Sequence, residues 1–105
     1  MLYRQGDVLI QRVNKIPKGL KPLPRDEHGR LVLAEGERTG HAHVVEGDAL
    51  FLAADLDEMT DRYLRIEQEA LVVHDEHDTI TLPPGDYQIV RQREYTPEQI
   101  RNVAD

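Results

Sequence analysis

Residues that favour turns interrupt this sequence roughly every 8 to 12 residues, and the segments between them are short and rich in β-branched side chains. This spacing is typical of antiparallel barrels and sandwiches. The sequence therefore predicts an all-β fold, built as a small antiparallel barrel or sandwich. A length of 105 residues without an internal repeat indicates a single domain over residues 1–105.

Eight segments have the length and composition of β-strands. They are residues 7–13, 31–33, 41–45, 49–52, 63–67, 70–73, 79–82 and 87–93. We expect hairpin turns at residues 46–48, where Gly47 tolerates a positive φ, and at residues 83–86, where two prolines precede a glycine. Residues 56–62 are compatible with either a helical turn or a loop.

Two segments depart from this strand pattern. Residues 16–30 contain three prolines and two glycines, which favours a long irregular loop. We interpret this Pro/Gly-rich loop as flexible and as a candidate gate over a binding site. Near the other end of the chain, Thr96 and Pro97 match the N-cap and the first position of a helix. The sequence therefore predicts a short C-terminal helix over residues 100–104.

Composition and charge exclude several classes of protein. Cysteine is absent, which excludes disulfides, thiolate chemistry and cysteine-containing zinc sites. The formal net charge of −7 argues against general nucleic-acid binding, although basic residues gather within 15–30 and acidic residues within 46–78. No apolar run is long enough to span a membrane, and the first residues lack the pattern of a signal peptide. We therefore expect a cytoplasmic protein without membrane partners.

Four of the five histidines form two close pairs, His41 with His43 and His74 with His77. Residues two apart on a strand face the same side, so His41 and His43 are expected to project into one space. His74 and His77 are three apart, and their side chains converge only if Asp75 and Glu76 form a turn. Imidazole is a common metal ligand near neutral pH, so two converging pairs predict a metal site.

The predicted ion is a divalent metal with nitrogen and oxygen ligands, which fits zinc, iron, manganese, nickel or copper. A site that keeps a water molecule would acidify it, and Glu46 or Glu76 is then the candidate general base. A site closed by all four histidines would be structural. In the alternative without a metal, residues 74–78 are a solvated acidic loop, and His28 is interpreted as a surface residue in either case.

The spacing of these residues resembles the cupins, a family of small metal-binding β-barrels. The first cupin motif is similar to the residues Gly36, His41, His43 and Glu46. The second motif is similar to Pro83 and Gly85, with Gln88 at the position where the family has a histidine. The resemblance implies a double-stranded β-helix in which His41, His43 and Glu46 are metal ligands.

Two functions follow as expectations from the sequence. The first is a small metal-binding β-barrel that performs metal-assisted chemistry on a small-molecule ligand. The second is a non-enzymatic accessory or interaction module, compatible with a homodimer, whose histidine cluster is a structural metal site or a pH-sensitive contact. The segment Gln5-Gly6-Asp7 before the first clear strand is interpreted as a turn, in which glycine permits a ligand to approach closely.

Overall fold

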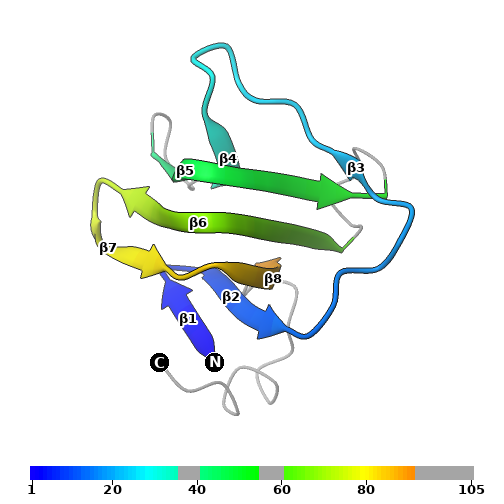
Figure 1. Cartoon of the computed structure of the whole chain (residues 1–105). Coiled ribbons are helices and arrows are strands. Elements are labelled where there is room, and N and C mark those ends of the chain that lie inside the picture. Colours follow the sequence, from blue (N-terminus) through cyan, green and yellow to red (C-terminus); the bar gives the residue numbers. More distant parts are fainter. Residues whose placement is uncertain (36–40, 55–60, 92–105) are drawn as a thin grey trace.

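The computed structural model describes residues 1–35, 41–54 and 61–91, and its regular structure there consists of antiparallel strands only (Figure 1). The strands are β1 (Leu2–Gln5), β2 (Val8–Val13), β3 (Lys21–Pro22), β4 (Leu31–Glu35), β5 (Ala42–Ala53), β6 (Arg62–His74), β7 (His77–Leu82) and β8 (Gly85–Arg91). The predicted all-β antiparallel class is therefore confirmed. The predicted C-terminal helix lies outside the described residues. No helix of membrane-spanning length and apolarity occurs in the described ranges.

The strands form one sheet in which β5 and β6 are shared by two halves. In one half the order is β4-β5-β6-β7, and in the other it is β3-β5-β6-β8-β2-β1. The end of β1 lies beside β7 (Figure 1), but these two strands are not paired in the part of the chain that the structure describes. The sheet is therefore not closed into a barrel, which was one of the two predicted architectures, the other being a sandwich.

The hairpin expected at residues 46–48 is wrong, because β5 runs through this segment without a turn. Between Gly47 and Ala49 the strand β5 advances by two residues while its partner β6 advances by four, from Ala70 to Ile66. The extra residues form a bulge in β6, which joins the two segments predicted as separate strands. Gly47 has the positive φ that its sequence suggested, but it serves this bulge instead of a turn.

The hairpin expected at residues 83–86 is also wrong in its pairing. β7 and β8 do not pair with each other, and both lie along the same edge of β6, with Leu82 opposite Ala70 and Gly85 opposite Ile66. Pro83 and Pro84 interrupt this edge beside the bulge in β6. Proline has no N–H to donate to a ladder, so the two prolines divide one long strand into β7 and β8 without reversing the chain.

The core is mainly aliphatic and includes two aromatic residues, Phe51 and Tyr87. Along β6 the side chains alternate between buried and exposed, and the buried ones pack against their counterparts on the other strands. The members with the least exposure are Val8, Ile10, Leu64, Val72, Leu82 and Tyr87. The Tyr87 hydroxyl donates a hydrogen bond of 2.6 Å to the carbonyl oxygen of Pro83, so this buried phenol has a polar partner.

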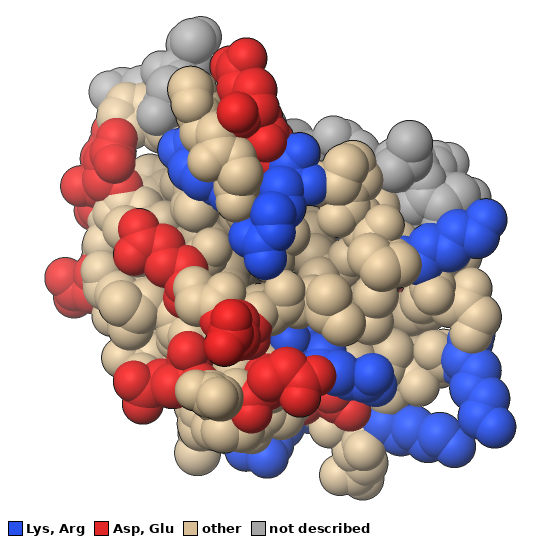
Figure 2. Space-filling model, turned by 45° about the horizontal axis from the view of Figure 1, so that its top comes forward, with Lys and Arg blue, Asp and Glu red and all other residues tan. Residues whose placement is uncertain are grey.

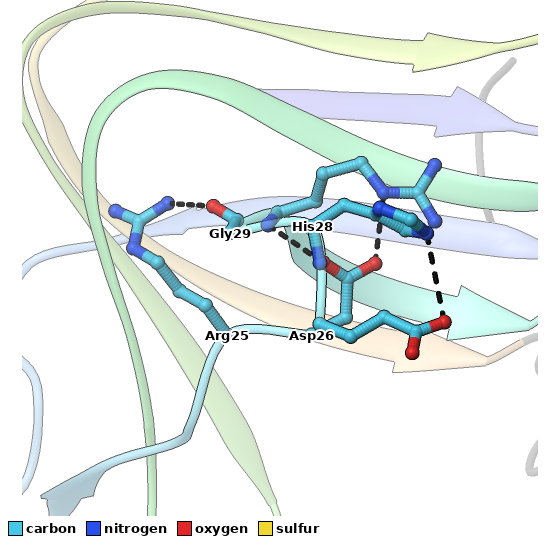
Figure 3. Close-up of polar contacts among 6 residues, drawn as sticks. Arg25, Asp26, His28 and Gly29 are labelled. Atoms are coloured by element: carbon cyan, nitrogen blue, oxygen red, sulfur yellow. Dashed lines mark hydrogen bonds and ion pairs between the residues drawn. The ribbon is translucent and has the colours of Figure 1, made fainter.

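The long loop after β2 is attached to the second half of β5. β3 pairs with Leu52 and Ala53, and the Arg25 guanidinium donates to the Ala49 carbonyl oxygen. Within the loop, the Asp26 carboxylate accepts hydrogen bonds from two backbone amides and from the Arg30 guanidinium (Figure 3). These bonds, led by the one from the Arg30 backbone, lower the pKa of Asp26. Because His43 lies in the first half of β5, these contacts do not place the loop as a gate over it.

Candidate functional site

The two histidine pairs lie side by side where β5, β6 and β7 meet. His43 is near the start of β5, while His74 ends β6 and His77 begins β7. The ring centroids of His74 lie 4.4 Å from His43, 4.7 Å from His77 and 6.0 Å from His41. His74 is therefore the central member of a cluster of four imidazoles, which we call the histidine cluster.

A two-residue turn at Asp75 and Glu76 positions two members of the cluster. It makes His74 and His77 direct cross-strand partners, so that both side chains reach the same side of the hairpin. Just before this turn the register shifts, and one residue of β6, Val73, faces two residues of β7, Asp78 and Thr79. Bulges of this kind occur next to functional sites, where they change the direction of a side chain.

His43 is the most deeply buried member, with only 2% of its side chain exposed, and His74 is also buried, at 9%. Its Nδ1 lies 2.8 Å from Gln5 Oε1, and its Nε2 lies 3.5 Å from the carboxylate of Asp7. Burial, followed by the nearby His74, lowers the pKa of His43 to about 4. His43 is thus neutral at physiological pH, which is the form in which imidazole binds a metal ion.

The Nδ1 atoms of His74 and His41 differ in their hydrogen bonding. His74 Nδ1 accepts a hydrogen bond of 3.0 Å from the backbone N–H of Glu76. His41 Nδ1 is buried without a hydrogen-bond partner among the described residues, although it lies 3.4 Å from an Asp75 oxygen and 3.6 Å from a Glu76 oxygen. A buried polar atom without a partner is costly, and a cation beside these two carboxylates would satisfy the nitrogen.

The cluster is not arranged as a formed metal site. Within the described ranges, no group of three or more His, Asp or Glu side chains is placed to hold a metal ion as it stands. The Nδ1 atom of the central ring, His74, already accepts a hydrogen bond from the Glu76 amide. The donor types nevertheless fit a divalent transition metal, because neutral imidazoles and carboxylates are the ligands such ions take in the absence of cysteine.

The turn between β1 and β2 forms one wall of the cluster. Gly6 has φ +59°, and a Cβ atom placed on it would lie 2.7 Å from His77 Nε2 and 3.3 Å from His43 Cε1. The close approach that the sequence suggested for this glycine is therefore made by histidine side chains of the same chain. A larger residue at this position would displace the imidazoles.

Replacing Gly6 with alanine is expected to disturb the cluster beyond its effect on the backbone. Gly29→Ala is the matched control, because Gly29 has φ +76° and no atom lies within 4 Å of the position that the added methyl group would take. Both variants should lose about 1 to 2 kcal/mol of unfolding free energy through the left-handed φ. Only Gly6→Ala should also shift the imidazole NMR signals of His43 and His77. Equal imidazole spectra in the two variants would contradict this placement of the turn.

Charge around the cluster favours a cation as its ligand. Figure 2 shows acidic side chains along the left and lower parts of the view, the left being the side of the β6–β7 turn in Figure 1, and basic side chains at the right edge and in the upper and lower centre. Asp7, Asp75 and Glu76 all approach cluster nitrogens within 3.6 Å. A negative rim raises the local concentration of cations and disfavours anions.

Two residues from the sequence motifs lie away from the cluster. Glu46 is exposed, and the alternation of β5 places it on the face opposite to His43 and the buried Val45. Gln88 is on β8, opposite Gln11 and Tyr63 in the other half of the sheet. Of the two proposed bases, only Glu76 is near an imidazole, at 3.6 Å from His41.

Sequence reasoning missed Gln5 and Asp7 as members of this site. Gln5 is 2% exposed and also donates to the carbonyl oxygens of Val72 and Asp78. The available signal was the Gln5-Gly6-Asp7 turn, but no local pattern indicates that it meets residues 67 or more positions away. That contact depends on how the sheet curves.

Comparisons with known proteins place the chain in a family without supplying an activity. No curated protein and no solved structure matches it. A family model matches residues 4–92, a range that contains all four histidines, Gln5 and Asp7. The chain therefore belongs to the family described as "Domain of unknown function (DUF8820)".

Proposed function

We propose that this protein binds a divalent transition metal ion at the histidine cluster. The observation that carries the proposal is the meeting of four imidazoles from two segments of the chain, with ring centroids 4.4 to 6.0 Å apart between neighbours. A cation is favoured by the neutral state of His43, by the His41 Nδ1 that has no hydrogen-bond partner among the described residues, and by the three carboxylates within 3.6 Å of cluster nitrogens. The cupin resemblance agrees on His41 and His43, but the geometry favours His74 and His77 over Glu46 as the remaining ligands.

Binding requires a local rearrangement of the β6–β7 turn. A ring nitrogen that accepts a hydrogen bond carries no proton, so neutral His74 is protonated at Nε2 while Glu76 donates to its Nδ1. To offer a lone pair to the ion, His74 must either move its proton to Nδ1 or present Nδ1 itself. Either change breaks the bond from the Glu76 amide. Metal binding is therefore coupled to the conformation of this turn.

The chemistry available to the bound ion depends on whether it keeps a water molecule. If it does, the ion lowers the pKa of that water, and Glu76, an exposed carboxylate 3.6 Å from His41 Nδ1, is the proposed acceptor of its proton, with Asp75 at 3.4 Å as the other carboxylate beside that nitrogen. If all positions are filled by protein, the ion holds the β5, β6 and β7 ends together as a structural centre. Exchange of metal-bound water, measured by NMR relaxation with Mn²⁺, distinguishes an open site in an enzyme from a closed site in an accessory module.

The test is metal binding by full-length protein purified without a histidine tag and stripped with a chelator. We expect calorimetric titration with Zn²⁺, Ni²⁺ and Mn²⁺ to find about one equivalent for at least one ion. An ion at 100 times its dissociation constant should add about 2.7 kcal/mol to the free energy of unfolding. The hydrogen exchange of the Glu76 amide should become faster on binding, because its bond to His74 is lost.

The double variant His41→Ala, His43→Ala should weaken binding by more than about 100-fold, since it removes ligands and not only their partners. His28→Ala is the matched control, because it removes an exposed imidazole outside the cluster. A folded wild-type protein that binds none of these ions would refute the proposed function. If the double variant bound the metal as tightly as the wild type, the binding site would not include His41 and His43.

A further inference from the structure

We infer that Gln5 is a positioning residue that fixes His43 in the tautomer protonated at Nδ1, so that the Nε2 lone pair stays free on the side of the ring where Asp7 lies. The expected effect of Gln5 on metal affinity rests on the proposed function, whereas its effect on the His43 tautomer is independent of it. The positions of the His43 ring nitrogens do not by themselves show which one carries the proton, but the hydrogen bonds of Gln5 do.

The orientation of the Gln5 amide is fixed by two carbonyl groups. Its Nε2 lies 2.9 Å from the carbonyl oxygen of Val72 and 2.9 Å from that of Asp78. Both are acceptors only, so the amide nitrogen must face them, and its two protons are both used. The reversed amide would set an oxygen against two oxygens in a buried position. Gln5 Oε1 is therefore the atom that faces His43.

The proton on His43 follows from this orientation. Oε1 is an acceptor without a proton, and it lies 2.8 Å from His43 Nδ1, so Nδ1 must be the donor. A neutral ring with a proton on Nδ1 has its lone pair on Nε2. That atom lies 3.5 Å from the Asp7 carboxylate, and the neighbouring ring atom Cε1 faces Gly6. Among the described residues, the unprotonated nitrogen of His43 therefore accepts no hydrogen bond from a backbone amide and can serve as a ligand directly. In His74 the unprotonated nitrogen is Nδ1, which already accepts the hydrogen bond from the Glu76 amide.

Gln5 also explains why the site forms where the sheet is open. β1 and β7 share no ladder in the described residues, and the Gln5 side chain reaches from the end of β1 to carbonyl groups of β6 and β7. The Asp78 carbonyl belongs to the bulge opposite Val73, where the ladder is irregular. One side chain therefore links the two edges of the sheet and sets the imidazole beneath them. A partner that orients a metal-binding histidine in this way typically changes metal affinity 10- to 100-fold.

The experiment compares Gln5→Met with the matched control Gln68→Met, which makes the same change at an exposed position of β6. Long-range proton–nitrogen NMR of the metal-free protein at neutral pH should find His43 protonated at Nδ1 in the wild type and in the control. In Gln5→Met this preference should be lost. Binding of Zn²⁺ should weaken about 10- to 100-fold in Gln5→Met and stay unchanged in the control.

The inference is overturned if wild-type His43 carries its proton on Nε2, or if folded Gln5→Met keeps the Nδ1 tautomer. If Gln5→Met fails to fold, the test uses the wild-type protein only. NMR then determines the His43 tautomer and the rate at which the two Gln5 side-chain amide protons exchange with solvent. Both protons should exchange slowly with solvent. A wild type that binds no ion but has the Nδ1 tautomer would refute the metal site and leave the role of Gln5 standing.

Discussion

Gly47→Ala is expected to lower the free energy of unfolding by about 4 kcal/mol, a large part of the 5–15 kcal/mol typical of a domain. Gly47 has φ +125°, which side-chain-bearing residues rarely adopt and which costs about 1–3 kcal/mol. A Cβ there would also lie 2.8 Å from the Glu69 carbonyl oxygen and 3.1 Å from the Ala70 Cα. Both are backbone atoms of β6, so relief requires moving the bulge, which adds about 1–3 kcal/mol of overpacking.

Urea denaturation of Gly47→Ala should be compared with that of Gly19→Ala. Gly19 also has a positive φ, of +86°, but nothing lies within 4 Å of the added carbon. The control should lose only the backbone cost, about 1 kcal/mol. If the two variants were equally stable, the close packing of β5 against the bulge in β6 would be wrong. A clearly larger loss in Gly47→Ala than in the control would locate the additional effect at this contact.

The metal-free protein is expected to lose about 3 kcal/mol of stability between pH 6.5 and pH 4 through His43 alone. Its pKa is lowered from 6.5 to about 4 in the folded state, mainly because burial disfavours the charged ring. Below pH 6.5 the unfolded chain takes up a proton that folded His43 refuses, so this contribution is complete above pH 6.5 and falls as the pH decreases. It is fully lost near pH 4.

The measurement is urea denaturation in the presence of a chelator at several pH values. His43→Gln removes the titrating ring and should flatten the dependence between pH 6.5 and pH 4, whatever its stability at neutral pH. His28→Gln, at an exposed loop position, should retain the wild-type slope. Identical slopes for His43→Gln and the wild type would contradict the burial of His43 as a neutral ring.

Local patterns predicted much of this molecule correctly. The strand composition indicated an antiparallel all-β fold, and β2, β4, β7 and β8 lie within or close to their predicted ranges. The turn at Asp75 and Glu76, which brings His74 opposite His77, was recognised as a condition for convergence. These features depend on neighbours in the sequence, where turn chemistry and alternation act directly.

The errors occurred where a local signal had two possible uses. Glycine at position 47 suits a hairpin turn and also suits a bulge within a continuous strand, and its own sequence does not distinguish them. The two prolines at 83 and 84 mark an interruption, but the chain can resume along the same edge instead of reversing. In each case the pairing with β6 decides between the two structures, and the residues of β6 involved are not neighbours in the sequence.

The sequence by itself determined the strand class, the absence of cysteine chemistry and the identity of the four imidazoles, because these follow from composition and from spacing along the chain. Only the tertiary structure decided that the two pairs meet, that Glu46 faces away and that Gln5 joins β1 to β7 above His43. The physical reason is the bulge in β6 and the curvature of the sheet, which bring the β1–β2 and β6–β7 turns together. Such long-range contacts depend on the packing of the whole core, and no local segment encodes them.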